Sequence, residues 1–287
     1  MNIKITLLLV LALFSVSTSP IIGRALEGVG SISISFWRMF FASIMLWLFS
    51  LIKPQGGIKL KKNKSKILFA GILLGFHFAL FFEAIKITNI SNATFLGTLA
   101  PFFTLLLEFY ILKRKYSKIV LIGLMFTFIG SMLILGYNFD LATTYTRGNI
   151  YAILCSVFLA FAFMIAEKVR EDETTIVYTR LLYMSAAITL LIFSLILNEN
   201  LIHHSFNEYL GLLFLGFVPT ILGHNSIYYA VKYVSPTIVA AYPLGEPIIA
   251  TILAYFIFNE IVSFNIVVGG SITFVGLILI SQYKKNK

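Results

Sequence analysis

The residues best suited to chemistry are ionisable side chains that lie inside long apolar stretches of the sequence. Glu246 is the clearest case, because it stands within an apolar run and is flanked by Pro243 and Pro247. Proline removes a backbone donor and disturbs a helix, and apolar surroundings penalise the charged form of a carboxyl group. Glu246 could therefore exchange protons or pair with the amine of a solute. The equally weighted alternative is a structural glutamate bonded to neighbouring helices.

Two histidines and two arginines could act together with Glu246. His77 and His224 lie inside other apolar runs, and a neutral imidazole can pass protons near neutral pH. The alternative is a hydrogen-bonded packing residue, which is the more common role of a lone histidine on a helix. Arg38 and Arg180 follow shortly after the starts of their runs. A guanidinium group can bind a carboxylate through two hydrogen bonds, or it can extend to the nearer headgroup layer.

Other residues could complete a polar cavity around these groups. Pro101 and Pro219 interrupt two further apolar runs, and a helix broken at mid-membrane offers its backbone polar groups to a solute or an ion. We expect the cavity to be lined by the helices that hold His77, Pro101, Pro219 and Glu246. Candidate hydrogen-bonding side chains on these helices are Asn92, Asn225, Tyr228 and Tyr242.

The elements that position these residues are predicted by composition. Of 287 residues, 59% are hydrophobic and 12% are charged, and the mean hydropathy is +0.93. Soluble domains have about 45–50% apolar and about 25% charged residues, so a soluble or a disordered chain is excluded. Ten apolar stretches are long and continuous enough for membrane-spanning helices and too continuous for outer-membrane strands. They lie near 5–23, 31–52, 67–85, 89–112, 119–137, 149–168, 174–197, 209–230, 236–258 and 263–282.

The basic residues predict the orientation of these helices. The net charge is +10, and 17 of the 22 Lys and Arg residues fall on one side of the membrane when the N-terminus is placed in the cytoplasm, while Arg38 and Arg180 lie inside apolar runs. Only Arg24, Lys86 and Arg147 fall in segments on the other side. Because positive loops stay in the cytoplasm, we expect a multi-pass protein of the inner (plasma) membrane with both termini cytoplasmic. The basic loop 53–66 could contact anionic lipids, and a nucleic-acid partner is not needed to explain the charge.

An internal repeat divides the chain into two halves. Residues 84–131 align without a gap with residues 230–277, so that Pro101 matches Pro247 and Gly123 matches Gly269. We expect two repeats, 1–138 and 149–283, of five helices each. An odd number of helices gives the second repeat the opposite orientation, which is the common build of secondary transporters. The alternative is a duplication kept only for stability.

Several features of the two halves together point to a known family. They are Arg38 and Arg180, the passage 230–236, Glu246-Pro247 followed by Phe258-Asn259-Glu260, and paired glycines in the last helix of each half. In these features the chain resembles the EamA-type members of the drug/metabolite transporter superfamily. The resemblance implies a ten-helix, all-α fold and the movement of small organic solutes such as amino acids, often outward. One departure is that Arg114 occupies the place in the first half that the acidic Glu260 occupies in the second.

We therefore predict a secondary transporter that exports a small organic metabolite by alternating access, driven by proton exchange or by the solute gradient alone. The alternative is an integral-membrane enzyme acting on a lipid-linked substrate, but the acidic cluster Glu171–Glu173 lacks the spacing that holds magnesium. No enzyme activity, cofactor or metal is expected. The glycines at 123, 130, 269 and 276 predict close helix packing, either within the chain or in a homodimer.

Overall fold

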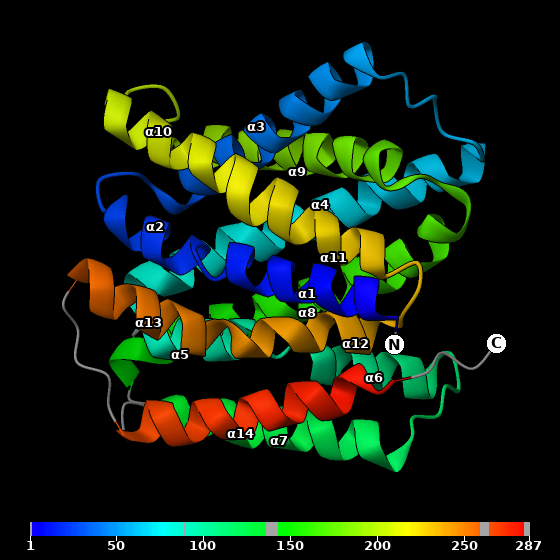
Figure 1. Ribbon diagram of the computed structural model, residues 1–287. Coiled ribbons are helices and arrows are strands. Elements are labelled where there is room, and N and C mark those ends of the chain that lie inside the picture. The colour runs from blue at the N-terminus through cyan, green and yellow to red at the C-terminus, as the bar shows by residue number, and fades with distance from the viewer. Residues whose placement is uncertain (1, 89, 136–142, 259–263, 284–287) are drawn as a thin grey trace.

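The computed structural model describes residues 2–88, 90–135, 143–258 and 264–283 as one bundle of helices, and these residues form no strand (Figure 1). The first half contains α1 (Ile3–Val16), α2 (Ser19–Ala25), α3 (Ser31–Ile52), α4 (Lys61–Ile87), α5 (Ile90–Gly97), α6 (Ala100–Tyr110) and α7 (Lys118–Leu135). The second half contains α8 (Thr143–Asp172), α9 (Thr175–Leu197), α10 (Phe206–Leu215), the π-helix η2 (Gly216–His224), α11 (Asn225–Ala230), α12 (Pro236–Ala241), the 3₁₀-helix η3 (Tyr242–Gly245), α13 (Glu246–Phe258) and α14 (Phe264–Ser281).

Apolar length makes these helices membrane-spanning. Eight helical segments of the described chain are long and apolar enough to cross a membrane, and two shorter apolar helices cover 118–133 and 267–281. Each shorter helix follows a span that is interrupted near a proline. Together the ten segments give the all-α membrane fold that the composition predicts. The start of α1 and the end of α14 lie at the same end of the bundle (Figure 1).

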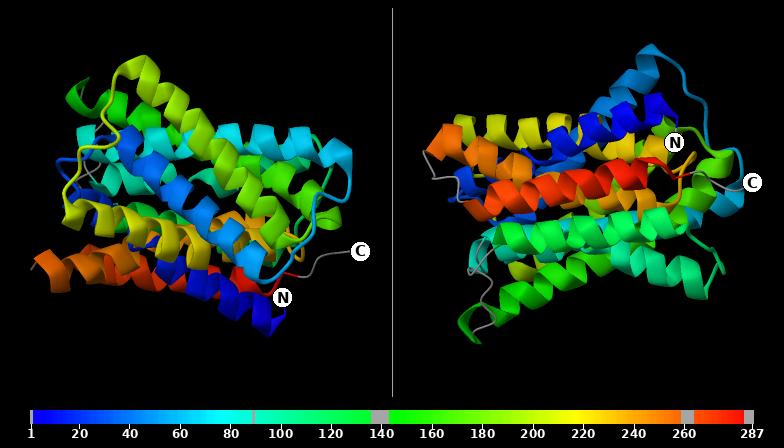
Figure 2. Two further views of the ribbon diagram at one scale, coloured as in Figure 1. Left: turned by 90° about the horizontal axis from the view of Figure 1, so that it is seen from above. Right: turned by 60° about the horizontal axis from the view of Figure 1, so that its bottom comes forward.

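Contacts between the halves follow a pseudo-twofold pattern. In the first half α4 packs against α8 of the second, and in the corresponding contact η2 and α11 of the second half pack against α1. The contacts α3–α9 and α7–α14 each join matching helices, and the contact α6–α12 has its counterpart in α5–α13. Both figures show α7 and α14 side by side (Figure 2). When each helix is replaced by its counterpart in the other half, every one of these contacts corresponds to a contact in the structure. The predicted fold of two inverted five-helix repeats is therefore confirmed, while the exact limits 1–138 and 149–283 stay a prediction.

Glycines allow α7 and α14 to cross at very short range. A Cβ atom added to Gly130 would lie 2.5 Å from the carbonyl oxygen of Gly269, and one added to Gly276 would lie 2.7 Å from that of Gly123. No side chain fits at these distances. The predicted glycine packing thus lies within the chain, and a homodimer stays a prediction.

Helices break at or beside most of the predicted prolines. Pro101 lies at the start of α6, just after the α5–α6 break, and Pro219 lies inside the π-helix η2. Pro243 lies in η3, which separates α12 from α13. Pro247 instead occupies the first turn of α13. A backbone N–H at this position has no acceptor within the helix, so proline is tolerated there. One break was not predicted: α1 and α2 separate just before Pro20.

Candidate functional site

A small cavity of about 40 Å³ lies where the interrupted helices meet. Its walls come from both halves, since they include the ends of α1, α2, α5, α6, α12 and α13 and parts of α3, α4, α8 and η2. Interrupted helices leave backbone groups free to face a solute. The polar and charged side chains that line the cavity are Ser19, Arg38, His77, Thr98, His224 and Glu246.

Arg38 is the positive charge of this cavity. It lies in the interior of α3 and is only 1% exposed. Its Nε donates to Oγ1 of Thr220 at 2.8 Å, and its Nη1 donates to Oγ of Ser19 at 2.7 Å. The guanidinium carbon lies 4.1 Å from the centre of the Phe78 ring. The remaining nitrogen, Nη2, is buried and has no hydrogen-bond partner among the described residues.

Glu246 supplies a carboxyl group to the same cavity. It is the first residue of α13, directly after η3, and is 6% exposed. The cavity therefore holds one guanidinium group and one carboxyl group, and both are buried.

The two predicted histidines meet on the wall of the cavity. Nδ1 of His77 lies 2.9 Å from the carbonyl oxygen of Cys155 in α8. Because a carbonyl oxygen only accepts, we assign the proton of His77 to Nδ1, which leaves Nε2 as an acceptor. The ring of His224 has its centre 6.5 Å from that of His77. Nδ1 of His224 is buried without a partner in the described part of the chain.

Four of the remaining predicted site residues are not among those that line the cavity. Arg180 donates from Nη2 to the carbonyl oxygen of Gly56 at 2.5 Å and stacks 4.3 Å from Trp47. Its helix, α9, begins at the end of the bundle where α3 finishes, so Arg180 holds the α3–α4 loop. The side chain of Asn92 lies outside the described residues. The other three predicted residues are not among the residues that line the cavity: Asn225, Tyr228 and Tyr242.

Several residues of the site were missed by the sequence analysis. Ser19 and Thr220 hold the guanidinium of Arg38, but a lone hydroxyl in an apolar run is common in membrane helices. Each of them stands next to a proline, Pro20 and Pro219. A hydroxyl residue beside a helix-breaking proline is the signal that could have found them.

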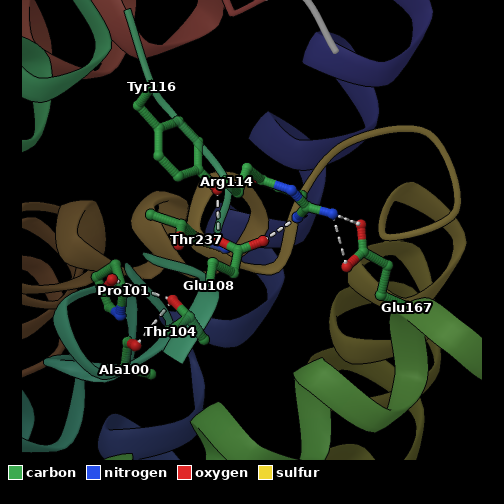
Figure 3. A network of polar contacts seen from close by, with 9 residues as sticks. Ala100, Pro101, Thr104, Glu108, Arg114, Tyr116, Glu167 and Thr237 are labelled. Atoms are coloured by element: carbon green, nitrogen blue, oxygen red, sulfur yellow. Dashed lines mark hydrogen bonds and ion pairs between the residues drawn. The ribbon is translucent and has the colours of Figure 1, made fainter. Parts of the chain in front are cut away.

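A second polar cluster lies where α6 meets α12, away from the cavity (Figure 3). Glu108 of α6 is fully buried and pairs with Arg114. Arg114 also reaches Glu167 of α8, with Nη2 3.0 Å from Oε1. Arg114 thus joins the first half to the second through two carboxylates. We call the residues Glu108, Arg114, Tyr116, Glu167, Ser235 and Thr237 the polar network.

Hydrogen bonds extend the polar network to α12. The backbone N–H of Thr237 donates to Oε2 of Glu108 at 3.3 Å. The hydroxyl of Tyr116 donates to Glu108 and lies 2.6 Å from Oγ of Ser235 (Figure 3). Burial and the neighbouring carboxylate of Glu108 raise the pKa of Tyr116 far above its ordinary value, so the phenol stays a donor. The network therefore ties together α6 of the first half and α12 of the second.

Known proteins resemble this chain over nearly its full length. An uncharacterized transporter, YdfC of Bacillus subtilis, is 24% identical, with 94% of this chain and 88% of YdfC covered. The pseudopaline exporter CntI of Pseudomonas aeruginosa is 24% identical, with 98% and 96% covered. An S-adenosylmethionine uptake transporter of Rickettsia conorii is 27% identical, with 87% and 83% covered. These names confirm the prediction of a transporter rather than an enzyme.

The fold and the repeat are matched as well. A crystal structure that is 17% identical superposes with a TM-score of 0.81 over 97% of this chain and 96% of its own, which supports the fold alone. The model of the EamA-like transporter family matches twice, at residues 2–136 and again at 146–282. This multi-pass membrane protein is therefore a transporter that belongs to the EamA-like transporter family.

Proposed function

We propose that the chain is a secondary transporter that exports a small organic metabolite, such as an amino acid, by alternating access. The observation that carries this proposal is the cavity itself, which lies among the helix breaks of both halves and holds Arg38 and Glu246. A site between two inverted halves can face either side of a membrane when one half tilts against the other.

The polar network supplies one of the two gates in this mechanism. With both termini in the cytoplasm, the basic segment 113–118 and the polar network lie at the cytoplasmic end of α6. The contacts between Glu108, Arg114 and Glu167 hold α6 against α8, and Thr237 adds α12. These contacts must separate before the cavity can open to the cytoplasm.

Glu246 is the residue on which coupling depends. Its carboxylate either pairs with the amine of a solute or exchanges a proton, and His77 and His224 lie on the same cavity wall. Outward movement rests on the resemblance to exporters, and among the relatives one is named as an exporter and another as an uptake transporter.

The experiment is a ligand screen followed by flux. Detergent-purified protein is screened for thermal stabilisation by amino acids and other metabolites, and each hit is tested in proteoliposomes with and without a pH gradient. We expect at least one hit to move and Glu246→Gln to abolish or uncouple its flux. A matched control is Ser271→Ala, since Ser271 is exposed on α14 and bonds only to its own helix. Failure of the whole panel to move, or unchanged flux in Glu246→Gln, contradicts the proposal.

A further inference from the structure

We propose that the cavity binds its solute through a carboxylate group at Nη2 of Arg38, and that Ser19 and Thr220 are positioning residues that hold the guanidinium for this contact. The inference rests on the proposed transport function and deepens it by naming the chemical class of the solute. It also assigns roles to two hydroxyl residues.

The first observation is the unpartnered nitrogen. Arg38 is 1% exposed, and two of its three nitrogens already donate to hydroxyl groups, while Nη2 has no partner among the described residues. A buried charged donor without an acceptor is costly. Arg38 lines the cavity, so a bound anion is the group that can supply the missing acceptor.

The second observation is how firmly the other two nitrogens are held. The hydroxyl of Thr220 donates to the carbonyl oxygen of Leu215 at 2.8 Å, so its only proton is committed. Its oxygen is therefore left as an acceptor for Nε of Arg38. This bond runs from the π-helix η2 back to the last residue of α10, and π-helices are frequent at functional sites. Ser19 accepts from Nη1 at the start of α2, just after a helix break.

The direction of approach favours a carboxylate. The ring of Phe78 covers one face of the guanidinium at 4.1 Å, so a ligand reaches Arg38 along its edge. A planar carboxylate meets that edge in the plane of the donors. Glu246 lines the same cavity and offers an acceptor to an ammonium group of the solute. A solute that carries both a carboxylate and an ammonium group leaves the summed charge of the cavity unchanged.

The ligand test compares acids with their amides, which keep the shape and lose the charge. The probes are L-leucine and L-leucinamide, nicotinate and nicotinamide, and propionate and propionamide, measured by thermal stabilisation and by inhibition of the flux of any transported hit. We expect at least one acid to bind with an affinity at least about tenfold above that of its amide. If amides and acids are equivalent while flux persists, the carboxylate site is overturned and the transport function stands.

The positioning role is tested by a pair of variants at one residue. Thr220→Val removes the hydroxyl at nearly constant volume, and Thr220→Ser retains it. We expect Thr220→Val to raise the KM for the acid probe about tenfold and to bring the acid-to-amide ratio close to 1. Thr220→Ser should restore both values, and Ser19→Ala should behave like Thr220→Val.

The control separates positioning from folding. Thr189→Val removes a half-buried hydroxyl of α9 that bonds to its own helix, and it should leave the acid-to-amide ratio unchanged. A structural role alone would make Thr220→Val weaken acid and amide equally. That outcome, or a Thr220→Ser variant as impaired as Thr220→Val, overturns the assignment.

Discussion

At the scale of single residues, two side chains of the same type have different roles because their neighbours differ. Arg38 and Arg180 occupy similar places early in matching helices, yet Arg38 lines the cavity and Arg180 holds the carbonyl oxygen of Gly56. Sequence identified both as buried cations, because charge within an apolar run is visible without a structure. It could not separate them, since their roles depend on which loops and helix breaks lie beside each side chain.

Glycine 130 allows a direct test of close helix packing. A Cβ at this position would meet backbone atoms of α14 at 2.5 Å, and backbone cannot move aside as a flexible side chain can. We expect Gly130→Ala to lower the stability of the protein by about 1–3 kcal/mol, measured as reversible unfolding in mixed detergent. Gly57→Ala is the control, because an added Cβ there meets nothing within 4 Å. Equal stability of the two variants would contradict the close crossing of α7 and α14.

Glu173 provides a pH-dependent test outside the membrane spans. Burial opposes its ionisation, but the N–H groups of Lys59 and Leu60 and the amide of Asn63 hold the pKa of Glu173 below its ordinary value of 4.5. A lowered pKa contributes stability above the unfolded-state pKa, and this stability is lost as pH falls through the folded-state pKa. Glu173→Gln should therefore lower the unfolding temperature near neutral pH, and the difference from wild type should shrink below about pH 4.5.

The neighbouring acid is the control for this measurement. Glu171 is exposed on the same segment, so Glu171→Gln should change the unfolding temperature little at any pH. A constant difference between Glu173→Gln and wild type across the acid range would show that the Glu173 carboxylate does not hold the start of α4.

At the scale of elements, the breaks in the helices build the site. Prolines 101, 219 and 243 predicted interruptions, and each lies at or beside one. The break between α1 and α2 was missed, because Pro20 reads equally well as the end of an apolar run. The polar network was also beyond sequence reasoning, since Glu108, Arg114 and Glu167 come together only through the packing of α6 on α8.

The polar network can be tested with the single cysteine of the chain. Cys155 is buried, and its sulfur would lie 3.4 Å from a Cβ added to Gly97, which lines the cavity. We expect Arg114→Gln to release α6 and to speed the modification of Cys155 by a small maleimide supplied from the cytoplasmic side. Arg147→Gln is the control, because Arg147 is exposed and contacts Tyr151 of its own helix. Equal labelling rates in the two variants would argue against a gate at the polar network.

At the scale of the whole molecule, the distribution of the basic residues predicts how the chain is oriented in the membrane. The start of α1 and the end of α14 lie at the same end of the bundle, as an even number of spans requires (Figure 1). Composition, repeat and charge pattern were sufficient for the fold class, because each is a property of long segments. The helix faces that converge on the cavity could not be predicted in this way. They depend on how each helix is rotated about its axis, and a single sequence does not fix that rotation.

Fusion proteins test the orientation. Green fluorescent protein attached to the C-terminus should fluoresce, and alkaline phosphatase at the same place should be inactive, because the positive-inside distribution holds this end in the cytoplasm. Alkaline phosphatase inserted in the segment 199–204, between α9 and α10, should be active. The reverse pattern would invert the topology and place the polar network at the outer end of the bundle.

The π-helix has a consequence for the kinetics of the whole cycle. Residues 216–224 form η2, whereas the matching stretch of the first half lies within the continuous helix α4. The two halves are therefore unequal at the centre of the bundle, so in the proposed alternating-access cycle we expect the two states reached by exchanging their conformations to differ in free energy. A carrier with unequal resting states is a rectifier: measured into an empty compartment, its maximal velocity should differ between the two directions, although it drives no net movement at equilibrium.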